Sequence, residues 1–96
     1  MNIMILAEQE HLRRGYKALL EIKGHSVTDD NPDCAVVDIG DDFTETSLKT
    51  VKAVAPGLIV FIVSATYSGK IPQIAEKTVV LRCPVTAEEL LKALIL

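Results

Sequence analysis

The segment Pro32-Asp33-Cys34-Ala35-Val36-Val37-Asp38-Ile39-Gly40 decides the fold of this chain. From Cys34 to Val37 it is a continuous apolar run, which is typical of a strand buried on both faces in a parallel α/β sheet. Pro32 has no amide donor and marks the turn into this strand. Asp38 then stands at the carboxyl end of the strand, which is the edge where open α/β sheets bind their ligands.

Other apolar runs extend this pattern along the chain. With the strand at 34–38, they predict four central strands in the spatial order of the chain, the others being residues 2–6, 58–63 and 78–81. Helices are expected at residues 10–23, 44–54, 72–76 and 87–95. Gly24 ends the first helix in a left-handed conformation, Thr44 caps the second, and Thr86 forms a capping box with Glu89 in the last.

The connection between the first helix and the strand at 34–38 is short. Only residues 25–33 lie there, and a crossover between parallel strands of one sheet requires about a dozen residues or more. We therefore expect no second helix, and a second strand that is missing or reduced to a stub at the edge. The result is a three-layer α/β sandwich with a reduced parallel sheet.

Composition places limits on function. The 96 residues predict a single domain, residues 1–96, and 49% of them are hydrophobic. A net charge of −3 without a basic patch predicts no nucleic-acid binding, and no apolar run is long enough to predict a membrane span. Cys34 and Cys83 do not have zinc-site spacing, and we expect them to be reduced thiols in a cytoplasmic protein.

The order of apolar strand, Asp38 and Ile39 resembles the phosphoacceptor strand of the receiver domains of two-component response regulators. The similarity covers nearly the whole chain, minus one strand–helix unit, and implies a flavodoxin-like fold. It also implies that Asp38 is the phosphoacceptor candidate. Ser64, followed by the small Ala65, matches the residue that contacts the phosphoryl group in this family.

Other site positions of the family are altered. Its two metal-binding acids after the first strand correspond here to Ala7 and Glu8, so Glu8, Asp38 and Gly40 are expected to bind Mg²⁺ weakly or not at all. An alternative role for Glu8 is a favourable interaction with the dipole of the following helix. The Lys-Pro pair of the family is Cys83-Pro84, for which the resemblance implies a cis peptide bond.

Arg82 does not replace the lost lysine. Strand alternation directs it to the face opposite Cys83, and a neutral thiol cannot offset the charge of a phosphoryl group. The aromatic switch position of the family is Val80, which has no ring to rotate.

The preferred interpretation is a degenerate receiver domain, a signalling and protein-interaction module that is not an enzyme and is not efficiently phosphorylated. The alternative is a working receiver phosphorylated on Asp38, while a relic carboxylate at Asp38 also stays open. A nucleophilic Cys83 is disfavoured because His11 and His25 lie along or beyond the first helix. A nucleotide or flavin site is disfavoured because no strand is followed by a glycine-rich loop.

Partners are expected from the missing helix. Its absence predicts that strand residues Ile3–Leu6 and Cys34–Val37 are partly open to water on one face, beside residues 25–33. We therefore expect a homodimer or a protein partner to cover them. A sensor histidine kinase is the further partner that the resemblance implies, and no cofactor is expected other than weakly bound Mg²⁺.

Overall fold

The computed structural model describes residues 1–40 and 45–95. Within them the chain forms one parallel sheet of five strands in the order β2-β1-β3-β4-β5, which confirms the predicted order of the four central strands. The strands are β1 (Asn2–Ala7), β2 (Ser26–Val27), β3 (Cys34–Gly40), β4 (Leu58–Val63) and β5 (Lys77–Arg82). The helices are α1 (Glu10–Ile22), α2 (Glu45–Val54) and α3 (Ala87–Ala93).

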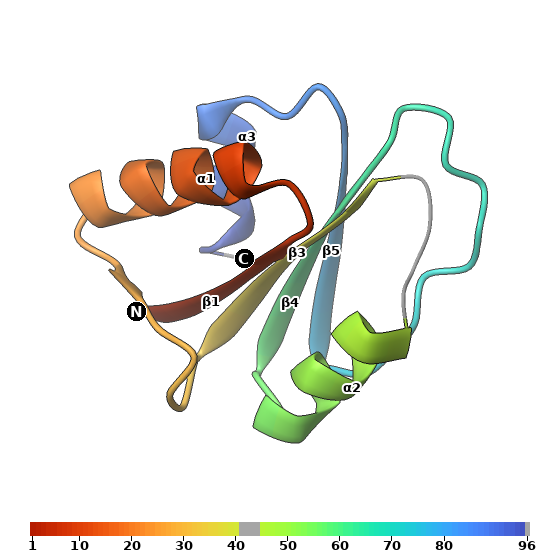
Figure 1. Cartoon of the computed structure of the whole chain (residues 1–96), viewed down its shortest axis with the longest axis horizontal. Coiled ribbons are helices and arrows are strands. Elements are labelled where there is room, and N and C mark those ends of the chain that lie inside the picture. Colours follow the sequence, from red (N-terminus) through yellow and green to blue (C-terminus); the bar gives the residue numbers. More distant parts are fainter. Residues whose placement is uncertain (41–44, 96) are drawn as a thin grey trace.

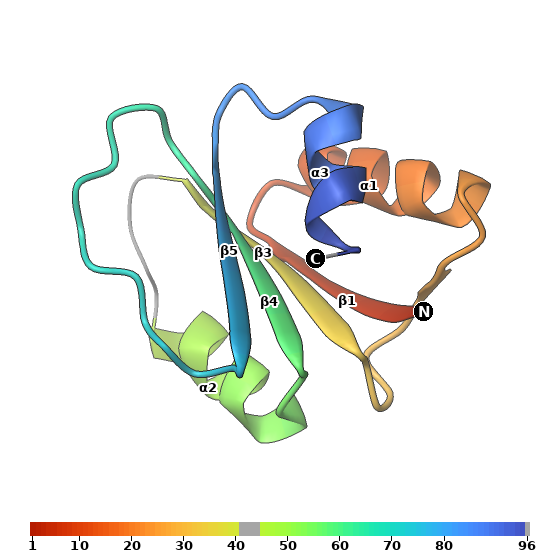
Figure 2. The same ribbon diagram turned by 180° about the vertical axis from the view of Figure 1, so that it is seen from behind.

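The elements form three layers, as predicted. Figure 1 shows α1 and α3 on one side of the sheet, with α2 and the connection between β4 and β5 on the other. The reverse view in Figure 2 gives the same arrangement. Because all strands are parallel, their carboxyl ends meet at one edge, and the end of β3 lies between those of β1 and β4. No helix in the described residues has the length and apolar character needed to cross a membrane.

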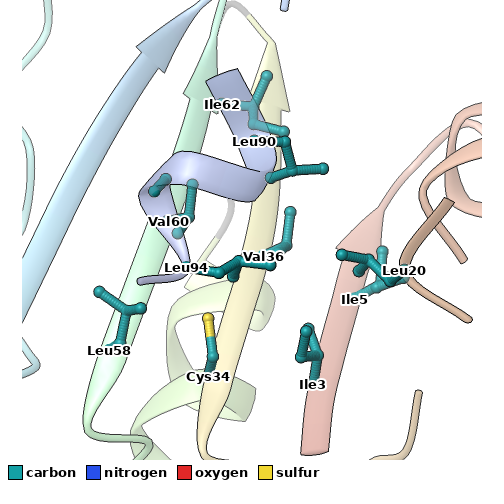
Figure 3. Close-up of a cluster of buried hydrophobic side chains, with 11 residues drawn as sticks. Ile3, Ile5, Leu20, Cys34, Val36, Leu58, Val60, Ile62, Leu90 and Leu94 are labelled. Carbon is teal, nitrogen blue, oxygen red and sulfur yellow. The ribbon is translucent and has the colours of Figure 1, made fainter. Parts of the chain in front are cut away.

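One side of the sheet packs against α1 and α3. Alternation along β3 places Cys34 and Val36 on this side, together with Leu20 of α1 and Leu90 of α3 (Figure 3). We call this group the α1–α3 cluster; its buried members are Ile3, Ile5, Leu20, Cys34, Val36, Leu58, Val60, Ile62, Leu90, Ala93 and Leu94. The same alternation places Asp38 on the α1 side of the sheet.

The other side packs against α2. The buried residues of this α2-side cluster are Met4, Ala35, Val37, Val51, Ile59 and Phe61. Every residue of β4 is buried, because strands on both sides pair with it and a cluster covers each of its faces. Its continuous apolar sequence is therefore the sequence of a central strand.

The expectation that the first two core strands are partly open to water on one face is wrong. Residues Ile3–Ile5 and Cys34–Val37 are at most 3% exposed, and Leu6 is partly buried. On the face expected to have too few helices, Val51 and Val54 of α2 pack in one cluster with Met4, Ala35 and Val37. Ile71 and Ile74, from the connection between β4 and β5, pack against the same cluster. The expectation of a homodimer or other partner therefore loses the apolar patch on which it was based.

The second strand is a stub at the edge of the sheet, which is one of the two expected outcomes. Ser26–Val27 is a two-residue strand that pairs in parallel with Asn2 and Ile3 of β1. Because β2 ends at the level of Ile3, whose other neighbour is Cys34, the chain crosses only the width of β1 to enter β3. A full crossover helix is therefore not needed, and none is present between these strands.

The expectation of a helix at residues 72–76 is wrong, because residues 64–76 form neither helix nor strand. So short a segment supplies about one hydrogen-bonded turn, which does not offset the cost of helix nucleation. Ile71 and Ile74 still reach the α2-side cluster from an irregular backbone, so their burial does not require a helix.

Local signals at the ends of elements are confirmed. Gly24 has φ +88° after α1, Thr86 and Glu89 form the capping box of α3, and Cys83-Pro84 is cis. The expected cap at Thr44 lies outside the described residues.

The buried thiol of Cys34 predicts alkaline instability. Burial, with a smaller effect of the Asp33 charge, raises the pKa of Cys34 to about 12. Above the ordinary thiol pKa of about 9 the unfolded chain releases a proton that the folded chain retains, so stability falls as pH rises. Between pH 9 and 11 we expect urea denaturation to show the wild type losing about 1 kcal/mol per pH unit more than Cys34→Ala. Parallel pH profiles of the two proteins would contradict this expectation.

Candidate functional site

The candidate site lies at the carboxyl end of β3. The register of pairing between β3 and β4 shifts between Asp38 and Gly40, so the ladder is irregular there. Gly40 has φ +55°, a left-handed conformation that glycine adopts without steric penalty. This local turn brings the Gly40 N–H back to Asp38 Oδ1 at 3.2 Å.

The second oxygen of the Asp38 carboxylate is also bound. The Tyr16 hydroxyl donates to Asp38 Oδ2 at 2.9 Å, in a partly buried position. Among the described residues, both hydrogen-bond donors to Asp38 are therefore neutral groups, a phenol and a backbone amide. The two hydrogen bonds satisfy a carboxylate that would be costly to bury without partners.

Tyr16 is a site residue whose place in the sequence indicates only the apolar face of the first helix. Its ring packs against the α1–α3 cluster, while its hydroxyl reaches the end of β3. Burial, the hydrogen bond to Asp38 and the charge of Asp38 together raise the pKa of the Tyr16 phenol far above its ordinary value. The phenol is therefore protonated and remains a donor. A tyrosine on a core-facing helical stripe is the signal that could have indicated it, because a buried phenol usually finds a polar partner.

Arg82 and Cys83 lie at the carboxyl end of β5, and their side chains point to opposite faces of the sheet, as predicted. Cys83 packs against the α1–α3 cluster, and burial and the Asp38 charge raise the pKa of its thiol, which keeps it neutral. Arg82 Nη1 instead donates to the backbone carbonyl of Tyr67 at 2.7 Å and to that of Ser64 at 3.5 Å. The guanidinium is therefore held by backbone groups of the irregular connection.

Ser64 lies directly after β4, at the same edge of the sheet. Its N–H donates to the Gly40 carbonyl at 2.8 Å, which ties the ends of β3 and β4 together. Its Oγ is buried and has no hydrogen-bond partner in the described part of the chain. The structure thus brings a free hydroxyl to the strand end next to that of Asp38.

Comparison with solved structures identifies this architecture. The N-terminal domain of a response regulator/sensory box/GGDEF three-domain protein from Carboxydothermus hydrogenoformans matches with a TM-score of 0.71 and 15% identity, over 99% of this chain and 91% of that one. A response regulator receiver protein from Sinorhizobium medicae matches with a TM-score of 0.69 and 19% identity, over 97% and 90%. The fold is that of a receiver domain.

The same fold also occurs outside receiver domains. A CMP N-glycosidase from Clostridium botulinum matches with a TM-score of 0.66 and 12% identity, over the full length of both chains. No family model and no curated protein matches the sequence significantly. The likeness therefore establishes the receiver-like fold and does not by itself establish a function.

The described residues do not bring together the several oxygen ligands that bind Mg²⁺ tightly. No group of three or more His, Cys, Asp or Glu side chains that could hold a metal occurs among them. Ala7, which pairs with Asp38, has no oxygen in its side chain, and the Glu8 side chain is exposed. Both Asp38 oxygens and the Gly40 carbonyl already accept hydrogen bonds. Asp41 and Asp42 lie outside the described residues.

Two further features of the chain lie away from this edge. His25 Nδ1 is 3.2 Å from the amino nitrogen of Met1, so it is not placed as a base for Cys83. A groove of about 510 Å³ runs between α1 and α3, which Figure 2 shows next to each other. Its lining is Leu19, Lys23, His25, Ala87, Glu88, Leu91, Lys92 and Ile95, and includes neither Asp38 nor Tyr16.

Proposed function

We propose that this chain is a degenerate receiver domain, a signalling and protein-interaction module that is not efficiently phosphorylated. The observation that carries the proposal is that the described donors to Asp38 are the neutral Tyr16 hydroxyl and Gly40 amide. Phosphoryl transfer depends on positive charge around the transferring oxygens. The position of the family's lysine is occupied by the neutral Cys83, and Arg82 binds backbone carbonyls instead.

A further position supports a role without catalysis. Val80, at the aromatic switch position of the family, is 39% exposed and has no ring to move between two states. A module of this kind acts through binding, so we infer a protein partner, which can be a second copy or a sensor histidine kinase. We also infer a cytoplasmic protein, because both cysteines are free thiols.

The second candidate is a working receiver phosphorylated on Asp38. One observation favours it: Ser64 Oγ is buried without a partner in the described residues, and it occupies the position that contacts the phosphoryl group in the family. A buried hydroxyl without a partner costs free energy, and an incoming phosphoryl oxygen would accept its hydrogen bond.

Beryllofluoride with Mg²⁺ distinguishes the two candidates, because it mimics a phosphoryl group on aspartate. For the wild-type chain we expect no saturable NMR shift of the Asp38, Gly40 and Ser64 amides with Mg²⁺ alone or with beryllofluoride at millimolar concentration. Intact mass after incubation with acetyl phosphate should be unchanged. Saturable shifts at lower concentration, or addition of a phosphoryl group that Asp38→Asn abolishes, would contradict the proposal and support the working receiver.

A further inference from the structure

We propose that Tyr16 is an intrinsic lock on Asp38: its hydroxyl binds one oxygen of the carboxylate, lowers the reactivity of that oxygen toward a phosphoryl donor, and ties α1 to the end of β3. The inference rests on the proposed function and adds the residue that keeps Asp38 unreactive. Tyr16 is a positioning residue here, because it acts only through Asp38.

Both oxygens of Asp38 are engaged, and they differ in what holds them. Oδ1 accepts the Gly40 N–H at 3.2 Å, a local contact made by the turn of the chain. Oδ2 accepts the Tyr16 hydroxyl at 2.9 Å, across 22 residues of sequence and from a different element. An in-line attack requires a lone pair directed at phosphorus. Oδ2 keeps a second lone pair, but the hydrogen bond from Tyr16 withdraws electron density from this oxygen and restricts its direction, so it opposes reaction at Oδ2.

The lock is held by packing. The Tyr16 ring contacts the α1–α3 cluster, so the hydroxyl cannot turn away from Asp38 without moving the ring out of that cluster. Its raised pKa keeps the phenol a donor. Unlike a lysine, however, a neutral phenol satisfies the carboxylate without bringing charge that would stabilise a transferred phosphoryl group.

The reaction that reveals the lock is acyl phosphate formation from acetyl phosphate. An Asp38 oxygen attacks phosphorus and forms a new O–P bond. The bond between phosphorus and the acetate oxygen breaks, and acetate leaves with the electron pair. Tyr16→Phe removes only the hydroxyl and keeps the ring, so Oδ2 loses this hydrogen bond while the packing remains.

The test uses the full chain carrying Ala7→Asp and Cys83→Lys. This charge-restored variant regains the metal-binding acid and the lysine of the family, so it reacts fast enough for the effect of Tyr16 on the rate to be measured. Phosphorylation by acetyl phosphate with Mg²⁺ is followed by intact mass spectrometry. Adding Tyr16→Phe should raise the rate roughly 10- to 100-fold, the value of one hydrogen bond to a charged group. Tyr67→Phe is the matched control, since its hydroxyl donates to the Lys70 carbonyl, and it should leave the rate unchanged.

Equal rates with and without the Tyr16 hydroxyl, in folded proteins, would overturn the lock. Rapid phosphorylation of the wild type would instead overturn the proposed function, so the two failures are distinguishable. If the charge-restored variant does not fold or react, a double-mutant cycle in the wild-type chain tests instead whether the Tyr16 hydroxyl and the Asp38 carboxylate interact. Tyr16→Phe and Asp38→Ala should be coupled by about tenfold in the urea unfolding equilibrium constant. Additive effects in this cycle would overturn the lock.

Discussion

A chain carrying Ala7→Asp and Cys83→Lys is expected to react with acetyl phosphate at Asp38 at least about 100 times faster than the wild-type chain. Ala7 pairs with Asp38 across the β1–β3 ladder, so an aspartate at position 7 places a second carboxylate beside the first. Cys83 is close enough for the Asp38 charge to raise the pKa of its thiol, so a lysine there can place its ammonium near the site. Loss of one charge-stabilising group typically slows a reaction roughly 100- to 1,000-fold, and the variant restores two.

The measurement is the rate of phosphoryl addition by intact mass in the presence of Mg²⁺, for the double variant, each single variant and the wild type. Asp38→Asn in the double variant is the control that assigns the modified residue. Each single variant should show less than the combined effect, because the metal and the lysine stabilise the same phosphoryl group. Equal rates for the folded wild type and double variant would show that charge at positions 7 and 83 does not limit the reaction.

Phe61→Ala is expected to remove a large part of the stability of the fold. Phe61 is fully buried at the centre of β4, the strand whose residues are all buried, and belongs to the α2-side cluster. Removing a buried phenyl ring leaves a cavity and costs about 3–5 kcal/mol. A domain of this size has an unfolding free energy of only about 5–14 kcal/mol. Urea denaturation should therefore show a much lower midpoint or a chain that is already largely unfolded.

Ile22→Ala is the control for this substitution. Ile22 is 80% exposed on α1, so truncation there should change the unfolding free energy by less than about 0.5 kcal/mol. A loss at Phe61 as small as that at Ile22 would mean that the α2-side cluster does not carry the stability of the sheet.

Much of the fold could be predicted because the relevant signals are local. Apolar runs at Ile3–Leu6, Cys34–Val37 and Leu58–Val63 can be satisfied only by strands buried on both faces, and parallel strands place Asp38 at the ligand edge. The opposite directions of Cys83 and Arg82 follow from the period of a strand. The cap of α3 and the left-handed Gly24 are likewise properties of a few adjacent residues.

Which segments cover the α2 side of the sheet depends on tertiary packing. A helix was expected at 72–76, but Ile71 and Ile74 bury their side chains from an irregular backbone, which has no periodic signature. The choice between a missing β2 and an edge stub stayed open for a related reason. Its pairing with Asn2 and Ile3 depends on where the chain returns after α1, and chain length alone does not specify this.

The amino-acid sequence was sufficient to place Asp38 near the carboxyl end of a buried strand and to show that position 83 is not a lysine. It did not determine what holds Asp38, because Tyr16 belongs to the apolar stripe of a helix and its ring alone explains that position. Only packing brings its hydroxyl to within 2.9 Å of a carboxylate 22 residues away. The physical reason is that tyrosine is both a core residue and a hydrogen-bond donor, and the fold decides where its donor points.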